Sequence, residues 1–191
     1  MTIHPNTEQR KKLKRYDIPG HAHELTFSCY HRFHYLNDPI CCALFIDELS
    51  QAREHFLFRL WAYILMPNHV HLFIYPTQKE YKIAAILQSI KGKTSKRYRD
   101  ILLAESPEKY DKLCIKAGTK KVFRFWQAGG GFDRNLWNAK AIHSSINYIE
   151  YNPVRAGLVN APEEWLWSSA HARYTNKGLL PDNLDIPVLM K

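Results

Sequence analysis

Two apolar segments separated by one Pro-Asn pair constrain the fold of this chain more than any other feature. The segments FLFRLWAYILM (56–66) and HVHLFIYP (69–76) each have the length and composition of a buried strand. Pro67-Asn68 between them is a typical turn, and so short a connection joins neighbouring antiparallel strands. The sequence therefore predicts an antiparallel hairpin that is largely buried in a sheet.

The other regular elements alternate between strand and helix patterns. HELTFSCYHR (23–32) alternates as a strand does, and Asp38 and Pro39 fit the cap and first position of a helix over 38–55. We also expect helices at 80–103 and 138–152, a strand at KVFRFWQ (121–127), a polar excursion at 104–120 and a flexible glycine run at 128–131. The order β-α-β-β-α-β-α predicts an α+β fold, a ferredoxin-like sandwich with an antiparallel sheet and helices packed mainly on one face.

The size of the chain suits one globular domain. It has 191 residues, 46% of them hydrophobic, and two domains would be cramped in that length. We expect a basic N-terminal arm at 1–19, a single domain at 20–175 and a C-terminal tail at 176–191. The sequence is compatible with a monomer or a homodimer.

The net charge points to a polyanionic partner. Lys and Arg number 27 against 18 Asp and Glu, which gives a formal net charge of +9. We expect no membrane role, because no run approaches the roughly 18 apolar residues of a spanning helix. The N-terminus lacks the apolar core of a signal peptide, and the four cysteines form no C-x-x-C pair. These features favour a cytoplasmic, nucleoid-associated protein with reduced thiols.

Two histidines on the second strand of the hairpin are candidate metal ligands. His69 and His71 project to the same face of a strand, and each can offer one ring nitrogen to a divalent cation. A pair of half-buried histidines on a sheet face fits the pattern equally well. Phe73 stands where the histidine-triad hydrolases need a third histidine, so that chemistry is disfavoured.

The helix at 138–152 offers a third ligand and a nucleophile. Beside its stripe of isoleucines, Tyr148 and Asn152 lie one turn apart on a flank that can border a sheet surface. Asn152 would give a side-chain oxygen to a hard cation, and Pro153 fixes where the helix ends. The pattern alone does not select Tyr148 over Tyr151 or Tyr174, and it fits an ordinary tyrosine at the edge of the core.

Basic side chains are candidate phosphate contacts. As a set they favour DNA binding, although for any one of them a solvated helix end or a solubilising tail is the more ordinary explanation. Arg15 belongs to the N-terminal arm, with Arg10, Lys11, Lys12 and Lys14. Five more basic residues lie near the end of one helix: Lys91, Lys93, Lys96, Arg97 and Arg99. Arg134 and Arg155 flank the tyrosine helix.

Several separated motifs resemble those of one family. MPNHVHLFI, FRFWQ, FDR, YIEYNPVRAGLV and WLWSSAHARY, in that order over about 20–175, closely resemble the REP-associated tyrosine transposases, single-tyrosine HUH nucleases in which U is a bulky apolar residue. The resemblance implies that Val70 is the U position and that His69, His71 and Asn152 bind Mg²⁺ or Mn²⁺. It also implies that Tyr148 is the nucleophile.

The resemblance implies a transposase that nicks and rejoins single-stranded DNA beside a hairpin through a 5′-phosphotyrosine link. A tyrosine hydroxyl, with an ordinary pKa near 10, needs metal and positioning to attack at neutral pH. This chain departs from its relatives at Ala128 and the three glycines after it, which puts any contact from that loop in doubt. The alternatives are a hairpin-binding protein that no longer cleaves and a metal-dependent hydrolase of small phosphate esters.

Overall fold

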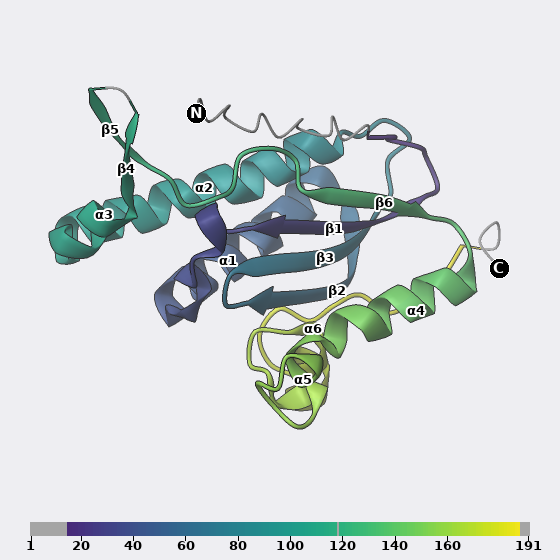
Figure 1. The fold of residues 1–191 in the computed structure, drawn as a ribbon. Coiled ribbons are helices and arrows are strands. Elements are labelled where there is room, and N and C mark those ends of the chain that lie inside the picture. The colour runs from purple at the N-terminus through teal and green to yellow at the C-terminus, as the bar shows by residue number, and fades with distance from the viewer. Residues whose placement is uncertain (1–14, 118, 188–191) are drawn as a thin grey trace, which may run out of the picture.

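A four-stranded antiparallel sheet forms the centre of the computed structural model, which describes residues 15–117 and 119–187 (Figure 1). Residues 1–14 of the expected basic arm, with Arg10, Lys11, Lys12 and Lys14, therefore lie outside the described residues. The strand order is β2-β3-β1-β6, with β1 Ala22–Ser28, β2 Phe58–Met66, β3 His69–Pro76 and β6 Phe132–Leu136. The predicted hairpin is present as β2 and β3, joined by the turn at Pro67-Asn68.

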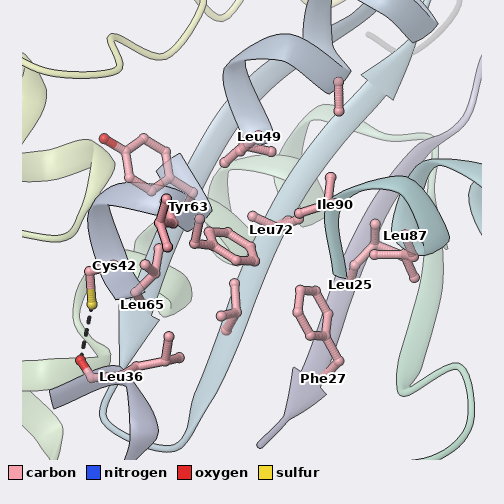
Figure 2. Close-up of a cluster of buried hydrophobic side chains, with 14 of the residues drawn as sticks. Leu25, Phe27, Leu36, Cys42, Leu49, Tyr63, Leu65, Leu72, Leu87 and Ile90 are labelled. Carbon is pink, nitrogen blue, oxygen red and sulfur yellow. Dashed lines mark hydrogen bonds between the residues drawn. The ribbon is translucent and has the colours of Figure 1, made fainter. Parts of the chain in front are cut away.

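Helices cover both faces of the sheet. On one face, α1 Pro39–Phe56 and α2 Ile83–Glu105 enclose a core in which Leu25, Leu72 and Ile90 are fully buried (Figure 2). On the other face, α4 Ala139–Glu150 packs against a second buried cluster. The α+β class and the antiparallel sheet are confirmed. The helices were expected mainly on one face, but α1 and α2 cover one face of the sheet and α4 covers the other.

The fourth strand of the sheet was predicted in the wrong place. Residues 120–123 form β5 Lys120–Phe123, which pairs with β4 Cys114–Ala117 in a separate hairpin that projects from the body (Figure 1). β6 pairs with β1 instead. The apolar pattern of 121–127 has another cause, since Phe125 is buried in the core beneath α2 without joining the sheet.

Short helices complete the described chain. Their bounds are η1 Tyr30–Arg32, η2 Tyr35–Asn37, α3 Pro107–Leu113, α5 Asn152–Arg155, η3 Pro162–Glu164 and α6 Ser169–Thr175. The polar excursion predicted at 104–120 therefore contains α3 and β4. Within 15–117 and 119–187, none of the helices has the length and apolar character needed to cross a lipid bilayer.

The segments expected as an arm and a tail contact the body where they are described. Asp17 accepts a hydrogen bond from the backbone N–H of Ile83 at 3.1 Å and so satisfies one N–H of the first turn of α2. Near the other end, the backbone N–H of Asp182 donates to the carbonyl of Leu60 at 2.7 Å, and Ile186 joins the core under α4. Residues 15–19 and much of 176–187 thus pack on the domain.

Candidate functional site

The histidine pair lies on the sheet face that α4 covers. His71 opposes Thr26 of β1, and residues 69, 71 and 73 of β3 point to the same side because side chains alternate along a strand. His71 is buried and His69 half-buried, and their ring centroids lie 4.9 Å apart. Two rings this close can share one cation, since a metal–nitrogen bond spans about 2 Å.

Each imidazole is oriented by a hydrogen bond at its Nδ1 atom. Thr26 Oγ1 lies 2.8 Å from Nδ1 of His71, and Asn68 Oδ1 lies 2.6 Å from Nδ1 of His69. The amide oxygen of Asn68 can only accept, so this contact favours Nδ1–H on His69, and the Thr26 hydroxyl can accept from Nδ1–H of His71 in the same tautomer. The lone pair of each ring is then on Nε2, which is the arrangement that metal-binding histidines have.

Both rings favour the neutral form. Burial lowers the pKa of His71 to about 3, and His69 and Arg155 add to the shift. Burial also lowers the pKa of His69, with a further effect of the Arg32 charge. At neutral pH the two rings therefore keep the lone pairs that a cation needs.

Tyr148 of α4 stands beside His71. The two ring centroids are 6.1 Å apart at 83°, and both residues line an open cavity of about 510 Å³. Tyr148 is 49% exposed, so about half of the residue is accessible from solvent. Of the three tyrosines that the sequence left open, Tyr148 is the one that lines this cavity, while Tyr151 and Tyr174 are exposed elsewhere.

The turn after α4 fixes the backbone under Tyr148. The guanidinium of Arg155 lies 4.2 Å from the centroid of the Tyr148 ring and also donates to the carbonyl of Tyr148. Asn152 Nδ2 donates to the carbonyls of Tyr148 and Ile149 at 3.0 and 3.2 Å. Both bonds use the amide nitrogen, so neither of them occupies the side-chain oxygen of Asn152.

The helix boundary at this turn was predicted wrongly. The tyrosine helix was predicted to end at Asn152, but α4 ends at Glu150, and Asn152 is the first residue of the one-turn helix α5. Pro153 accounts for the difference, because proline is tolerated in the first turn of a helix but not in its interior. The side chain of Asn152 still reaches back to the last turn of α4.

The donor set limits which metal could bind. Among the residues that the structure describes, no group of three or more His, Cys, Asp or Glu side chains could hold a metal ion. A site at His69 and His71 would need an additional oxygen ligand. In the described part of the chain, Asn152 does not line the cavity of His71 and Tyr148, and its amide contacts the last turn of α4, so its role as the third ligand stays a prediction.

A buried ion pair that the sequence analysis missed borders the same cavity. Arg134 of β6 donates to Glu24 of β1 and, at 2.9 Å, to Ser145 of α4. Glu24 is 5% exposed, whereas half of the Arg134 side chain remains accessible. Arg134 was selected as a phosphate contact from its place in the sequence. Its partner could not be found that way, because the pairing depends on the register between β1 and β6.

The five basic candidates on α2 lie on different sides of the helix. Lys93 and Arg97 face α1, where they pair with Glu48 at 3.9 and 2.8 Å. The other three line a groove on the opposite side of α2, together with Arg15: Lys91, Lys96 and Arg99. Lys93 and Arg97 therefore contact a carboxylate of α1, whereas Lys91, Lys96 and Arg99 face the groove.

Comparison with known proteins identifies one family and several similar chains. The family described as "Transposase IS200 like" matches residues 20–113, which include both histidines and end before α4. A REP-associated tyrosine transposase of Haemophilus influenzae is 26% identical over 129 residues, which are 66% of this chain and 67% of the relative.

A solved structure extends the likeness over nearly the whole chain. It is a REP-associated tyrosine transposase bound to a REP hairpin, with a TM-score of 0.67 and 17% sequence identity. The match covers 94% of this chain and 96% of that chain. At this level of identity the likeness confirms the fold.

Proposed function

This chain belongs to the IS200-like transposase family, as its motifs predicted, and on that premise we propose that it nicks and rejoins single-stranded DNA through a covalent bond to Tyr148. The observation that carries the proposal is the contact between the Tyr148 ring and His71 in one open cavity. A nucleophile and a candidate metal ligand from distant parts of the chain share this cavity.

Tyr148 has the role of nucleophile. Its hydroxyl oxygen loses a proton and attacks the scissile phosphorus, the bond to the 3′ oxygen breaks, and that oxygen takes up a proton as a free 3′-hydroxyl. The product is a 5′-phosphotyrosine. Because one phosphoester replaces another, a different 3′-hydroxyl can reverse the step and join new strands without ATP.

His69, His71 and the oxygen of Asn152 would hold a divalent cation, Mg²⁺ or Mn²⁺. When bound, the cation supplies positive charge at the scissile phosphate and offsets the charge that develops during attack. Arg155 keeps the phenol ring in place by stacking on it. Arg134, held by Glu24 and Ser145, presents its exposed guanidinium to the same cavity and is suited to bind a phosphate oxygen.

The DNA partner is proposed to be a single strand that carries a hairpin, as formed by palindromic repeats. The solved relative that covers nearly the whole chain is bound to a REP hairpin. The formal charge of +9 fits a phosphate backbone.

Substitution of the nucleophile tests this function. A 5′-labelled and a 3′-labelled oligonucleotide with a hairpin and single-stranded flanks are incubated with the protein and Mg²⁺ or Mn²⁺. We expect a covalent adduct with wild-type protein and with Tyr151→Phe, and none with Tyr148→Phe, while all three proteins bind the hairpin. An adduct with Tyr148→Phe would refute the role of this residue. Binding without nicking by the wild type would instead support the non-cleaving hairpin-binding protein.

A further inference from the structure

The turn that follows β1 contains two neighbouring residues in the left-handed region of backbone space. His31 has a φ of 48° and Arg32 a φ of 55°, and neither is a glycine. A side chain makes this conformation unfavourable, so it persists only where the surrounding structure enforces it, often at a functional site. We propose that the strained turn aims Arg32 at the scissile phosphate beside the histidine pair, where its guanidinium binds a non-bridging oxygen during attack by Tyr148. The inference rests on the proposed function for the reaction.

Hydrogen bonds to a distant segment enforce the strained turn. The backbone N–H of Tyr30 donates to the carbonyl of Phe125 at 2.8 Å, and that of His31 donates to the side-chain oxygen of Gln127 at 3.2 Å. The backbone N–H of Gln127 donates in turn to the carbonyl of Ser28 at 2.9 Å. Because Phe125 is buried in the core, this segment is fixed, and the turn cannot relax without breaking these bonds.

A further bond connects the turn to the histidine pair. The backbone N–H of Cys29 donates to the carbonyl of Asn68 at 2.8 Å, and Asn68 Oδ1 lies 2.6 Å from Nδ1 of His69. The backbone N–H of Arg32 donates to the carbonyl of Cys29 at 3.1 Å. The backbone of Arg32 is therefore linked to the His69 ring through Cys29 and Asn68.

The charge of Arg32 acts on the histidine pair. Burial is the largest cause that lowers the pKa of His69, and the Arg32 charge adds to the shift. At His71 the same kind of contribution comes from Arg155. A positive charge that acts on these rings also acts on any ion bound between them.

Arg32 differs from the two other arginines of the site in having no partner. Arg155 donates to the carbonyl of Tyr148, and Arg134 donates to Glu24. Among the described residues, no carboxylate pairs with Arg32 and no hydrogen bond uses its guanidinium. Its planar fork of N–H donors is therefore available to an anion and suits two oxygens of one phosphate.

An unpaired cation beside two metal ligands has opposite effects on the two ions of the site. Without DNA, Arg32 repels a divalent cation at His69 and His71 and weakens its binding. A phosphate that contacts Arg32 cancels this repulsion, so the cation and the phosphate each bind more tightly when the other is present. During attack, charge develops on the phosphate oxygens, and Arg32 stabilises it without a proton transfer.

Titration with Mn²⁺ in the absence of DNA, followed by electron paramagnetic resonance, separates this role from a structural one. Arg32→Gln removes the charge and should bind Mn²⁺ about two- to fivefold more tightly than the wild type at low salt. The control Arg59→Gln loses the same charge at the far end of the hairpin, where Arg59 opposes Tyr75 whereas His69 opposes Met66, and should bind as the wild type does. Unchanged or weaker binding by Arg32→Gln, or no binding by the wild type, would overturn the proposal.

Substitution by glycine tests why the turn is strained. Glycine adopts a positive φ without strain, so Arg32→Gly should melt at the same temperature as the wild type or higher. A strained residue whose removal leaves stability intact is retained for its side chain. A clear loss of thermal stability would assign Arg32 a structural role instead and contradict the proposal.

Reaction with the flanked hairpin oligonucleotide tests the contact with phosphate. At saturating Mn²⁺, Arg32→Gln should form the Tyr148 adduct about a hundredfold more slowly, Arg32→Lys should retain part of the rate, and Arg59→Gln should react as the wild type does. In unreactive Tyr148→Phe protein, added DNA should tighten Mn²⁺ binding, and the further change Arg32→Gln should reduce this gain.

The outcomes distinguish this inference from the proposed function. An unchanged adduct rate in Arg32→Gln, or an unchanged gain of Mn²⁺ affinity on addition of DNA, would refute the contact between Arg32 and phosphate. If the wild type forms no adduct, the nuclease function fails. The Mn²⁺ titrations with and without DNA then still decide whether Arg32 couples the cation to a phosphate.

Discussion

A single hydroxyl on a neighbouring strand is expected to tune the metal affinity of this site. Thr26 Oγ1 lies 2.8 Å from Nδ1 of His71, and His71 is only 6% exposed. Thr26→Val keeps the shape of the side chain but removes the acceptor. The His71 ring then loses the partner that holds its Nδ1 atom and, through it, the orientation of the ring.

The size of the effect follows from the burial of His71. A buried ring N–H without an acceptor costs about 1–3 kcal/mol, so Thr26→Val should lower the free energy of unfolding by that order. Loss of a partner that orients a metal ligand weakens metal binding about 10–100-fold. That range corresponds to about 1.4–2.7 kcal/mol of binding free energy.

Titration of the purified protein with Mn²⁺, followed by electron paramagnetic resonance, measures this affinity directly. Thr26→Ser retains the hydroxyl and should bind Mn²⁺ nearly as the wild type does. Thr94→Val is the matched control, because Thr94 is fully buried and its hydroxyl has no partner among the described residues. An unchanged dissociation constant in a folded Thr26→Val protein would show that this hydrogen bond does not prepare His71 for a metal.

Three further outcomes follow from the geometry. Gly131→Ala should lower the free energy of unfolding in urea by about 2 kcal/mol or more. A Cβ atom at Gly131 would lie 2.1 Å from the carbonyl oxygen of Thr26, and the φ of this residue is +73°. Gly129→Ala is the control and should cost less, because the space around Gly129 is open. Because the folded pKa of His71 is about 3 and its ordinary value is 6.5, the unfolded chain takes up a proton that the folded chain refuses. The free energy of unfolding should therefore fall as pH decreases from about 6.5 toward 3, by up to about 1.4 kcal/mol per pH unit, and His71→Gln should reduce this slope in pH-dependent denaturation. A thiol reagent at pH 8 should modify the half-buried Cys114 first, because burial raises the pKa of both Cys29 and Cys42 to about 12. Mass spectrometry of the folded protein measures the order of modification, and equally fast reaction of the buried thiols would contradict this prediction.

The parts of the fold that the sequence predicted correctly are those with a local signal. The β2–β3 hairpin follows from two apolar runs and a turn, and α1 follows from Asp38, whose carboxylate accepts from the N–H of Ile40 at 3.0 Å. The fourth strand failed because its signal is not local. β6 reads FDRNL, in which polar residues outnumber apolar ones, and its pairing with β1 depends on Gly131 approaching Thr26.

The site shows the same division between local and distant information. The spacing of His69 and His71 predicted a shared face, and the structure places both rings on one side of β3. Thr26 and Glu24 could not be selected, because their roles depend on which residue of β1 opposes which residue of β3 and β6. Charge alone also could not separate Lys96, in the groove, from Lys93, which is paired with α1.

The choice among the tyrosines depends on how α4 is rotated against the sheet. Its buried isoleucines form the stripe that packs on β2 and β3, and this packing sets the direction of every other side chain of the helix. At about 100° per residue, Tyr151 lies about 180° from the centre of the stripe, whereas Tyr148 lies on the flank that it shares with Ser145. That flank borders the cavity beside His71. The angles are contained in the sequence, but only the position of α4 over β3 tells which flank meets the histidines, and a hydrophobic stripe alone leaves that choice open.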